Sequence, residues 1–307
     1  MGTITAYSLG CAIYLTAMYL GYKWLLSNEN RPGFNRLILL SICFTAMIAP
    51  AISLLPGSFS APGAGTAVID DITPDTELSL MPEQPTLIMV IPIIIYFFGV
   101  SVCLIRLLSE VFVLRRIIAH GHHQKKDTYT LVITDNTDIA PFSWLNYIVI
   151  NREDYANSLN TMLLHESCHT ASRHWLDIAF VRLTAIFQWY NPAAWLLYRE
   201  LKSVHEFQAD SQVLAAGVDP RDYQMLLIKK AVGSRFPSLA NNLNHSQLKK
   251  RVTMMYKSKS ATAGIRAAII VPALFAGWFI STIPAVASVT TGLSETALYS
   301  ESAAVPE

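Results

Sequence analysis

Four long apolar runs restrict the fold of this 307-residue chain more than any other feature of its sequence. They cover residues 3–22, 37–55, 86–105 and 267–288, and each is long enough to cross a bilayer as one helix. The composition agrees with a membrane protein, because 52% of the residues are hydrophobic and only 15% are charged. We therefore expect a membrane protein that is mainly α-helical, with four transmembrane helices.

The positive charges of the chain are distributed very unevenly. Of the 23 Lys and Arg residues, 3 lie between the first and second apolar runs, and the other 20 lie between residues 106 and 266. The loop 56–85 and the tail 290–307 contain none. Because cytosolic segments of membrane proteins carry an excess of Lys and Arg, we expect residues 106–263 to face the cytosol and both termini to face outward.

These patterns divide the chain into four parts. Residues 1–105 are expected to form a membrane anchor with three transmembrane helices and the outer loop. Residues 106–263 are expected to form a cytosolic domain, since this segment is long enough to fold on its own. Residues 264–289 then form the fourth transmembrane helix, and residues 290–307 a short outer tail. The net charge of +1 gives no reason to expect direct binding of nucleic acid.

The cytosolic segment has the pattern of an α+β domain. Two short stretches rich in Tyr, Val, Ile and Thr predict strands, and Asn191–Pro192 and Asp219–Pro220 are typical helix starts. The expected strands are 129–134 and 147–151 with a turn at 141–144 between them, and the expected helices are 158–172, 175–189, 193–215 and 220–232.

One of these helices carries the HExxH sequence His165-Glu166-Ser167-Cys168-His169. Residues four apart lie on the same face of a helix. Both imidazoles can therefore bind one Zn²⁺, and Glu166 can reach a water molecule in an open coordination position. A structural zinc site would usually be closed by cysteines, and the sequence has no Cys-rich set. We expect one catalytic zinc ion per chain, with Glu166 as the general base.

A catalytic zinc site usually has three protein ligands, so a third ligand must come from another element. We favour Glu206, which begins a Glu-x-x-x-Asp pattern on a separate helix, 37 residues after His169. Asp210 lies one turn further along and is expected to orient a ligand imidazole as a hydrogen-bond acceptor. The weaker candidates for the third ligand are His174, Asp177, Glu200 and His205.

Two other functional classes can be weighed against a zinc protease. A non-catalytic signal transducer could use zinc only to brace its helices, but it would not need Glu166. A metal transporter would carry ionisable groups near the middle of its transmembrane helices, and the four apolar runs have none there. The cluster His120–His123 lies in a basic stretch after the third run, where a solvated segment facing lipid headgroups is the simpler interpretation.

Four motifs occur in the same order as in the BlaR/MecR family of bacterial membrane zinc metallopeptidases, which this chain resembles over about residues 1–290. The motifs are Ala140-Pro-Phe-Ser-Trp144, the HExxH sequence, Asn191–Pro192 and Glu206-Phe-Gln-Ala-Asp210. The resemblance implies a place in the bacterial cytoplasmic membrane and a gluzincin-like α+β zinc protease domain between the third and fourth spans. It further implies that His165, His169 and Glu206 are the zinc ligands, that Glu166 is the catalytic residue and that Asp210 is a supporting acid.

The resemblance also suggests a substrate and partners. It places Pro141, Phe142, Ser143 and Trp144 along the substrate cleft, where an exposed strand edge could hold an extended peptide. In this family the protease acts in signal transduction, and its activation leads to loss of a cytosolic transcriptional repressor or to self-cleavage. The sequence leaves the oligomeric state open, a homodimer included.

The chain departs from the β-lactam sensors of that family in two ways. Only a short tail follows the last apolar run, where those sensors carry a penicillin-binding domain. We therefore expect the signal to be something other than a β-lactam bound by this chain. Many relatives also have an acid five residues after the second histidine of HExxH, where this chain has His174. We expect Asp177 to take over the role of that acid beside the zinc ligands.

Overall fold

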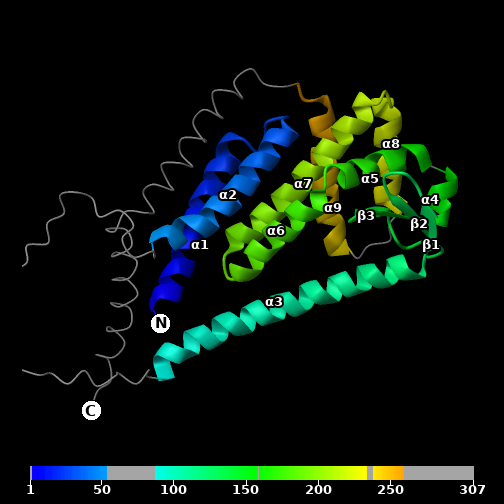
Figure 1. Cartoon of the computed structure of the whole chain (residues 1–307). Helices are drawn as coiled ribbons and strands as arrows, with labels where there is room; N and C mark the ends of the chain where they lie inside the picture. Colours follow the sequence, from blue (N-terminus) through cyan, green and yellow to red (C-terminus); the bar gives the residue numbers. More distant parts are fainter. Residues whose placement is uncertain (1, 54–86, 158, 234–237, 259–307) are drawn as a thin grey trace, which may run out of the picture.

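The computed structural model describes residues 2–53, 87–157, 159–233 and 238–258 (Figure 1). These residues form a bundle of helices with a small sheet at one end, and one long helix, α3 (Leu87–His120), runs beside the bundle (Figure 1). The expected outer loop, fourth transmembrane helix and outer tail fall outside the described residues. The expectations for them therefore stay predictions.

The small sheet has four strands in the order β1-β2-β4-β3. In the middle, β2 (Thr130–Thr134) pairs in parallel with β4 (Tyr147–Asn151). The edge strands β1 (His122–Lys125) and β3 (Phe142–Trp144) pair antiparallel to β2 and β4. The two middle strands are largely buried, as their β-branched residues favour. Both strands expected from the sequence are confirmed.

The turn expected at 141–144 is wrong. Residues 142–144 form β3, and Trp144 pairs with Tyr147 of β4, so the chain reverses instead at Leu145 and Asn146. Leu145 has a φ of 53°, which lies in the left-handed region that two-residue hairpin loops use. Pairing with β4 is favoured over a local turn because it satisfies the backbone hydrogen bonds of this segment.

The four helices expected after the sheet are present, and the described part of the chain has two more, at Arg152–Asn157 and Ser238–Tyr256. Asn191 caps α7, where its side chain accepts a hydrogen bond of 2.9 Å from the backbone N–H of Ala193. Asp219 caps α8 by accepting from the backbone N–H of Arg221 at 2.8 Å. Both predicted helix starts are confirmed. The helices are α4 (Arg152–Asn157), α5 (Leu159–Ala171), α6 (His174–Phe187), α7 (Pro192–Ala215), α8 (Pro220–Gly233) and α9 (Ser238–Tyr256).

The first two apolar runs form α1 (Gly2–Leu25) and α2 (Pro32–Ser53). Both helices lie beside α7, and together they build a large buried core that includes Leu15, Leu39 and Leu197 (Figure 1). One face of each helix is therefore covered by protein, while apolar residues on another face, such as Ile13, Leu20 and Phe44, are exposed. That α1 and α2 cross a bilayer stays a prediction.

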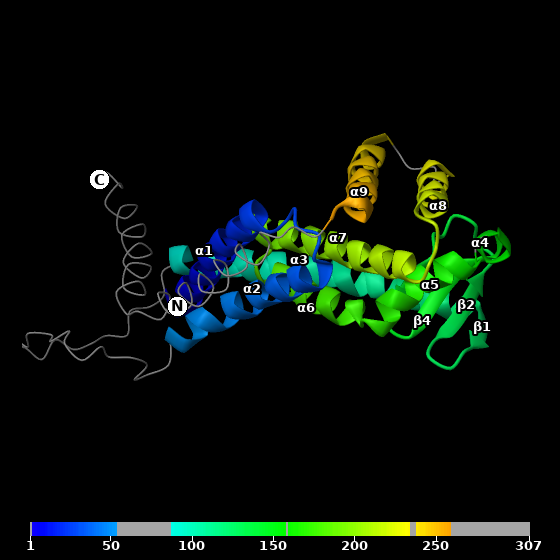
Figure 2. The same cartoon turned by 90° about the horizontal axis from the view of Figure 1, so that it is seen from above.

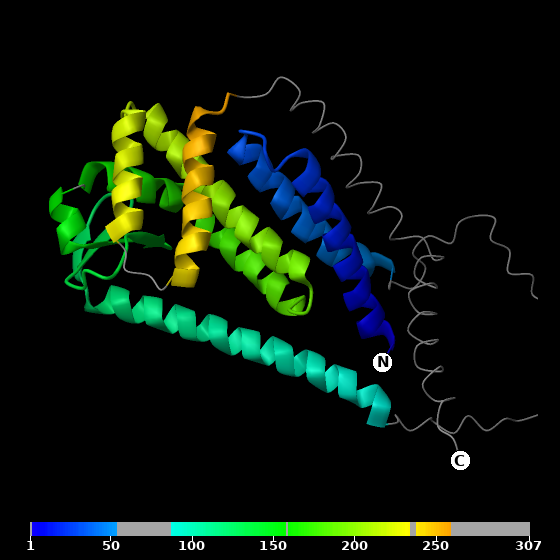
Figure 3. The same ribbon diagram turned by 180° about the vertical axis from the view of Figure 1, so that it is seen from behind.

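The third apolar run is the first half of α3. Within the described residues, the segment Val90–His120 is the one helix found to be long and apolar enough to cross a membrane. It extends along the bundle and is exposed over most of its length (Figure 3). It meets the bundle at Gly99, which packs so closely on Trp189 that a Cβ atom would collide with the indole. A second contact is the 3.0 Å ion pair between Glu110 and Arg182 of α6.

Candidate metal centre

The two histidines of the HExxH sequence lie on one face of α5 and point to the same place. Their Nε2 atoms are 3.3 Å apart. The helix ends at Ala171, and Arg173 then adopts a left-handed conformation with a φ of 52°, so that α6 begins directly afterwards. This sharp break folds His174, the first residue of α6, back against His169, which a continuous helix would not allow.

Glu206 of α7 brings a carboxylate to the same place. Its oxygens lie 3.4 Å from Nε2 of His165 and 3.7 Å from Nε2 of His169. Zinc binds nitrogen and oxygen in a tetrahedron at roughly 2.0–2.1 Å, which places neighbouring donor atoms about 3.3–3.4 Å apart. The spacing of the three donors therefore fits a zinc ion. No other group of His, Cys, Asp or Glu in the described part of the chain was found with such spacing.

The weaker candidates for the third ligand have other partners. Glu200 forms ion pairs with Lys23 and Lys250 at 2.7 Å and 2.8 Å. His205 turns toward Asp177, with 2.9 Å between its Nε2 atom and Oδ2 of the acid. These contacts explain why α7 presents one carboxylate to the paired imidazoles, although it carries several residues that could bind a metal.

The Nδ1 atom of His165 faces Tyr223 of α8. The Tyr223 hydroxyl lies 2.9 Å from this nitrogen and donates a hydrogen bond of 2.7 Å to Oδ1 of Asp210. Asp210 itself is 3.5 Å from Nδ1 and accepts a hydrogen bond of 2.9 Å from Nε of Arg251. Arg251, on α9, also pairs with Glu206 at 3.0 Å. Asp210 therefore approaches His165 chiefly through Tyr223. The helices α8 and α9, which stand on one side of α7 (Figure 2), each contribute a residue to the site.

The sequence does not single out Tyr223 or Arg251. Tyr223 follows a helix start, and nothing in its neighbourhood marks it as different from other tyrosines. Arg251 belongs to the basic run Lys249–Arg251. The one available signal is that a buried acid such as Asp210 needs a cationic partner, but this signal does not identify which basic residue serves.

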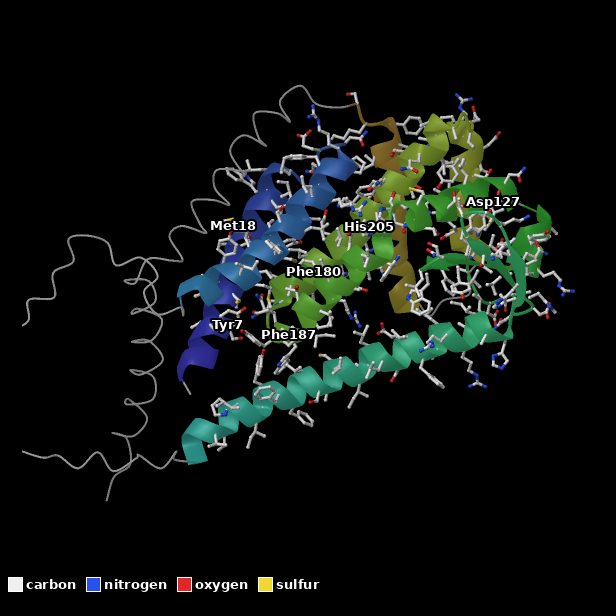
Figure 4. The ribbon with its side chains drawn as sticks, viewed as in Figure 1. Tyr7, Met18, Asp127, Phe180, Phe187 and His205 are labelled. Atoms are coloured by element: carbon white, nitrogen blue, oxygen red, sulfur yellow. The ribbon has the colours of Figure 1, made fainter. Side chains whose placement is uncertain are left out.

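A second imidazole lies against His169. The Nδ1 atoms of His169 and His174 are 2.8 Å apart, and Nε2 of His174 is 3.3 Å from Oε1 of Gln208. The His174 ring stacks on His205 with 3.9 Å between centroids and 5° between planes, and Figure 4 labels His205 among the side chains of the bundle. His174 thus lies against the imidazole of His169. Asp177, which was expected beside the zinc ligands, instead contacts His205 and forms an ion pair of 2.6 Å with Arg36.

Burial keeps these imidazoles neutral. It lowers the pKa of His169 to about 4, and it lowers the pKa of His174 to about 3, where the charge of His205 adds to the effect. The His169 and His174 rings are therefore neutral near neutral pH. A histidine binds a metal only through an unprotonated nitrogen. Burial also acts on His165, but the hydrogen bond with Glu206 and the charge of that carboxylate outweigh burial and raise the pKa of His165.

The two carboxylates of the site are shifted in opposite directions. Burial raises the pKa of Glu166, and the charge of Glu206 adds to this, although His165 and a hydrogen bond from Ser143 oppose it. Burial also acts on Glu206, but its hydrogen bond with His165 and the charge of Arg251 outweigh burial and hold its pKa well below its usual range. Glu206 is therefore ionised and suited to bind a cation, whereas Glu166 is the more basic group.

Two cavities adjoin at His169 and Glu206, which border both of them. The first, of about 490 Å³, is bordered by Pro141, Phe142 and Ser143 and also contains the Glu166 side chain. The second, of about 480 Å³, lies between α3 and α6 and has Trp144 at its edge. Ser143 borders both cavities, so they form one cleft that passes the donor atoms. That this cleft holds a substrate stays a prediction.

The histidine cluster at the end of α3 does not join this centre. His120 contacts the backbone carbonyl of Arg116 at 2.8 Å, and His123 contacts that of Ile118 at 2.7 Å. Their strand β1 is exposed along its whole length. This arrangement agrees with a solvated segment.

Comparison with protein families identifies a match. A family model described as BlaR1 peptidase M56 matches residues 58–255, which is more than half of the chain. The matched segment includes the HExxH sequence and the carboxylate of α7. No curated protein compared with the chain matches it.

Proposed function

Because the chain belongs to the BlaR1 peptidase M56 family, we propose that it is a zinc endopeptidase of the bacterial cytoplasmic membrane. Its active site faces the cytosol, and it switches on gene expression by cutting a cytosolic repressor or its own chain. One observation carries the proposal. The donor atoms of His165, His169 and Glu206 all lie within 4.8 Å of one another, at a cleft that also contains Glu166.

The donor set suits a catalytic metal better than a structural one. Three protein donors leave the fourth position of a tetrahedral site open. When bound, zinc polarises the carbonyl of the scissile peptide and lowers the pKa of a water molecule in the open position. His174 and Tyr223 lie 2.8 Å and 2.9 Å from the Nδ1 atoms of His169 and His165, on the side away from Glu206.

Glu166 supplies the proton transfers. It follows His165 directly on α5 and lines the cavity that contains the donor atoms. Its carboxylate accepts a proton from the attacking water and passes that proton to the leaving amine nitrogen. Burial raises the pKa of Glu166, which makes it a stronger base than an exposed glutamate.

The cleft suits an extended peptide. β3 is an edge strand of the sheet, and its residue Ser143 borders both halves of the cleft. A peptide along this edge would gain backbone hydrogen bonds, as in strand addition to other sheets, and would pass the donor atoms. Leu107, Val111 and Ile178 line the second cavity, which favours a large apolar side chain in the substrate.

Charge and the length of α3 support the cytosolic position of the site. Nearly all the positive charge lies after residue 105, on the side that the positive-inside rule assigns to the cytosol. The second half of α3, at Leu107 and Leu114, lines the cleft. A bilayer around the first half of α3 would leave the donor atoms near its cytosolic surface. Cleavage of a repressor is supported by the family resemblance.

The test uses the full chain, purified in detergent. The wild type should bind zinc and cut itself or a test protein such as casein. Glu166→Gln should retain zinc but lose about 100-fold or more in cleavage rate, because general-base catalysis contributes that much. The control Glu153→Gln changes an exposed glutamate of α4 and should alter neither property.

Two outcomes would contradict the proposal. A Glu166→Gln protein that cuts as fast as the wild type would remove Glu166 from the reaction. A wild type that binds zinc but cuts nothing would favour the zinc-braced transducer. If the wild type is active, coexpression with a winged-helix repressor encoded beside its gene should lead to loss of the intact repressor, and Glu166→Gln should prevent this loss.

A further inference from the structure

Tyr223 is a buried residue of α8 whose hydroxyl lies between the metal centre and an ion pair. Its side chain is only 2% exposed, and its oxygen is 2.9 Å from Nδ1 of His165 and 2.7 Å from Oδ1 of Asp210. Both oxygens of the Asp210 carboxyl group accept hydrogen bonds from Arg251, and Oδ1 also accepts from the Tyr223 hydroxyl. The hydroxyl therefore donates its single proton to Asp210 and must accept from His165.

This direction determines the tautomer of His165. A tyrosine oxygen that accepts from the imidazole requires the ring proton on Nδ1, and in the neutral ring, which is the form that binds a metal, this leaves Nε2 unprotonated. Nε2 is the atom that lies 3.4 Å from the carboxylate of Glu206 and 3.3 Å from Nε2 of His169. The tautomer imposed by Tyr223 is therefore the one in which His165 can bind a metal together with the other two donors.

We propose that Tyr223 is a positioning residue of the metal centre, which holds His165 in the rotation and tautomer that direct Nε2 toward the ion. The inference rests on the proposed function, because it assumes that a metal binds these donors. It adds a residue from a helix that the HExxH and Glu-x-x-x-Asp motifs do not include.

Asp210 cannot replace the hydroxyl without moving. Its Oδ1 atom is 3.5 Å from Nδ1 of His165, which is longer than a normal N–H···O hydrogen bond. Its other oxygen accepts from Arg251 at 2.9 Å, so the carboxylate is held from the far side. Without the Tyr223 hydroxyl, the Nδ1 proton would have no acceptor at normal distance in this arrangement, and the ring would be free to take the other tautomer.

The two ligand histidines are thus oriented by different groups. His169 has Nδ1 of His174 at 2.8 Å, whereas His165 depends on a hydroxyl from α8. A substitution of Tyr223 therefore affects His165 and leaves His174, the partner of His169, in place. Loss of such an outer hydrogen bond typically weakens metal binding 10- to 100-fold.

The experiment compares Tyr223→Phe with the wild type and with Tyr198→Phe in the full chain. Tyr198 also borders the cleft, but its ring makes the contacts with Arg182 and Lys202, at 5.1 Å and 5.6 Å, and phenylalanine keeps a ring there. The zinc dissociation constant is measured by competition with a chromogenic chelator. The visible absorption spectrum of the Co²⁺ form reports the ligand geometry, and thermal unfolding in excess EDTA reports the metal-free fold.

We expect Tyr223→Phe to bind zinc at least about tenfold more weakly than the wild type, with an altered Co²⁺ spectrum and an unchanged metal-free unfolding temperature. Tyr198→Phe should match the wild type in all three measurements. Equal zinc affinity and equal spectra for Tyr223→Phe would overturn the inference and leave the proposed function standing.

Two further results are equally decisive. If Tyr223→Phe unfolds in EDTA under conditions in which the metal-free wild type stays folded, Tyr223 supports the fold and not the metal centre, and the inference fails. If the wild type binds neither zinc nor Co²⁺, the proposed function itself fails. The two failures are therefore separated by the wild-type measurement.

Discussion

Glu200 of α7 connects three helices that are far apart in the sequence. Its carboxylate pairs with Lys23 of α1 at 2.7 Å and with Lys250 of α9 at 2.8 Å. The Glu200 side chain is 8% exposed, while the two lysines are 46% and 30% exposed. The change Glu200→Gln keeps the shape of the side chain but removes its charge, so both lysines lose their anion.

We expect Glu200→Gln to lower the free energy of unfolding by about 1–3 kcal/mol near neutral pH. Breaking a fully buried ion pair costs about 3–5 kcal/mol, and an exposed pair contributes about 0–1 kcal/mol. The half-exposed lysines place this cluster between the two limits, because water replaces part of the lost interaction. The loss should appear as faster hydrogen exchange in α9, since Lys250 connects that helix to α7.

The effect should depend on pH in a defined direction. Burial raises the pKa of Glu200, but its hydrogen bonds with Lys23 and Lys250 and their charges outweigh burial and hold the pKa below its usual value. A carboxyl group with a depressed pKa in the folded state stabilises the protein above the pKa of the unfolded chain, about 4.3. That contribution is lost as the pH falls through the folded value. The difference between the wild type and Glu200→Gln should therefore shrink in acid.

The assay is unfolding of the full chain in detergent, near neutral pH and in acid. The matched control is Glu110→Gln, which breaks an ion pair of 3.0 Å with Arg182 whose glutamate is 59% exposed. This control should lose less than about 1 kcal/mol. Equal losses in the two variants, or a loss for Glu200→Gln that stays constant down to strongly acid pH, would refute the reasoning.

Two further substitutions test the site and the core separately. His174→Phe should weaken zinc binding about tenfold or more, because it removes the acceptor 2.8 Å from Nδ1 of His169. The phenylalanine keeps an aromatic ring at this position. Unchanged zinc affinity in a chelator competition would show that the contact does not orient His169. Leu197→Ala should lower the free energy of unfolding by about 2–5 kcal/mol, since the side chain is fully buried between α1, α2 and α7. The control is Leu196→Ala, because the neighbouring Leu196 is 46% exposed. An equal loss of unfolding free energy in the two variants would contradict the packing argument.

The HExxH part of the site could be predicted from the sequence because it depends on local geometry. Helical spacing alone places His165 and His169 on one face, and the structure shows their Nε2 atoms 3.3 Å apart. The choice of Glu206 needed more, since it assumed that a later helix returns to the first. The helix start at Asn191–Pro192 indicated such a helix, and ligand chemistry favoured a carboxylate on it.

Other parts of the fold could not be predicted because they depend on partners distant in the sequence. Whether residues 142–144 form a turn or a strand depends on β4, which pairs with them. The position of His174 depends on the left-handed conformation of Arg173, for which the sequence pattern offers no signal. In each case a non-local contact or a single backbone angle decides the result.

The sequence by itself determined the arrangement of apolar and charged segments and the two imidazoles on one helix face, because these follow from residue type and helical period. Only the tertiary structure decided which groups surround the ligands. Tyr223 and Arg251 reach the site from α8 and α9, and their selection depends on how four helices pack, which no spacing along the chain encodes.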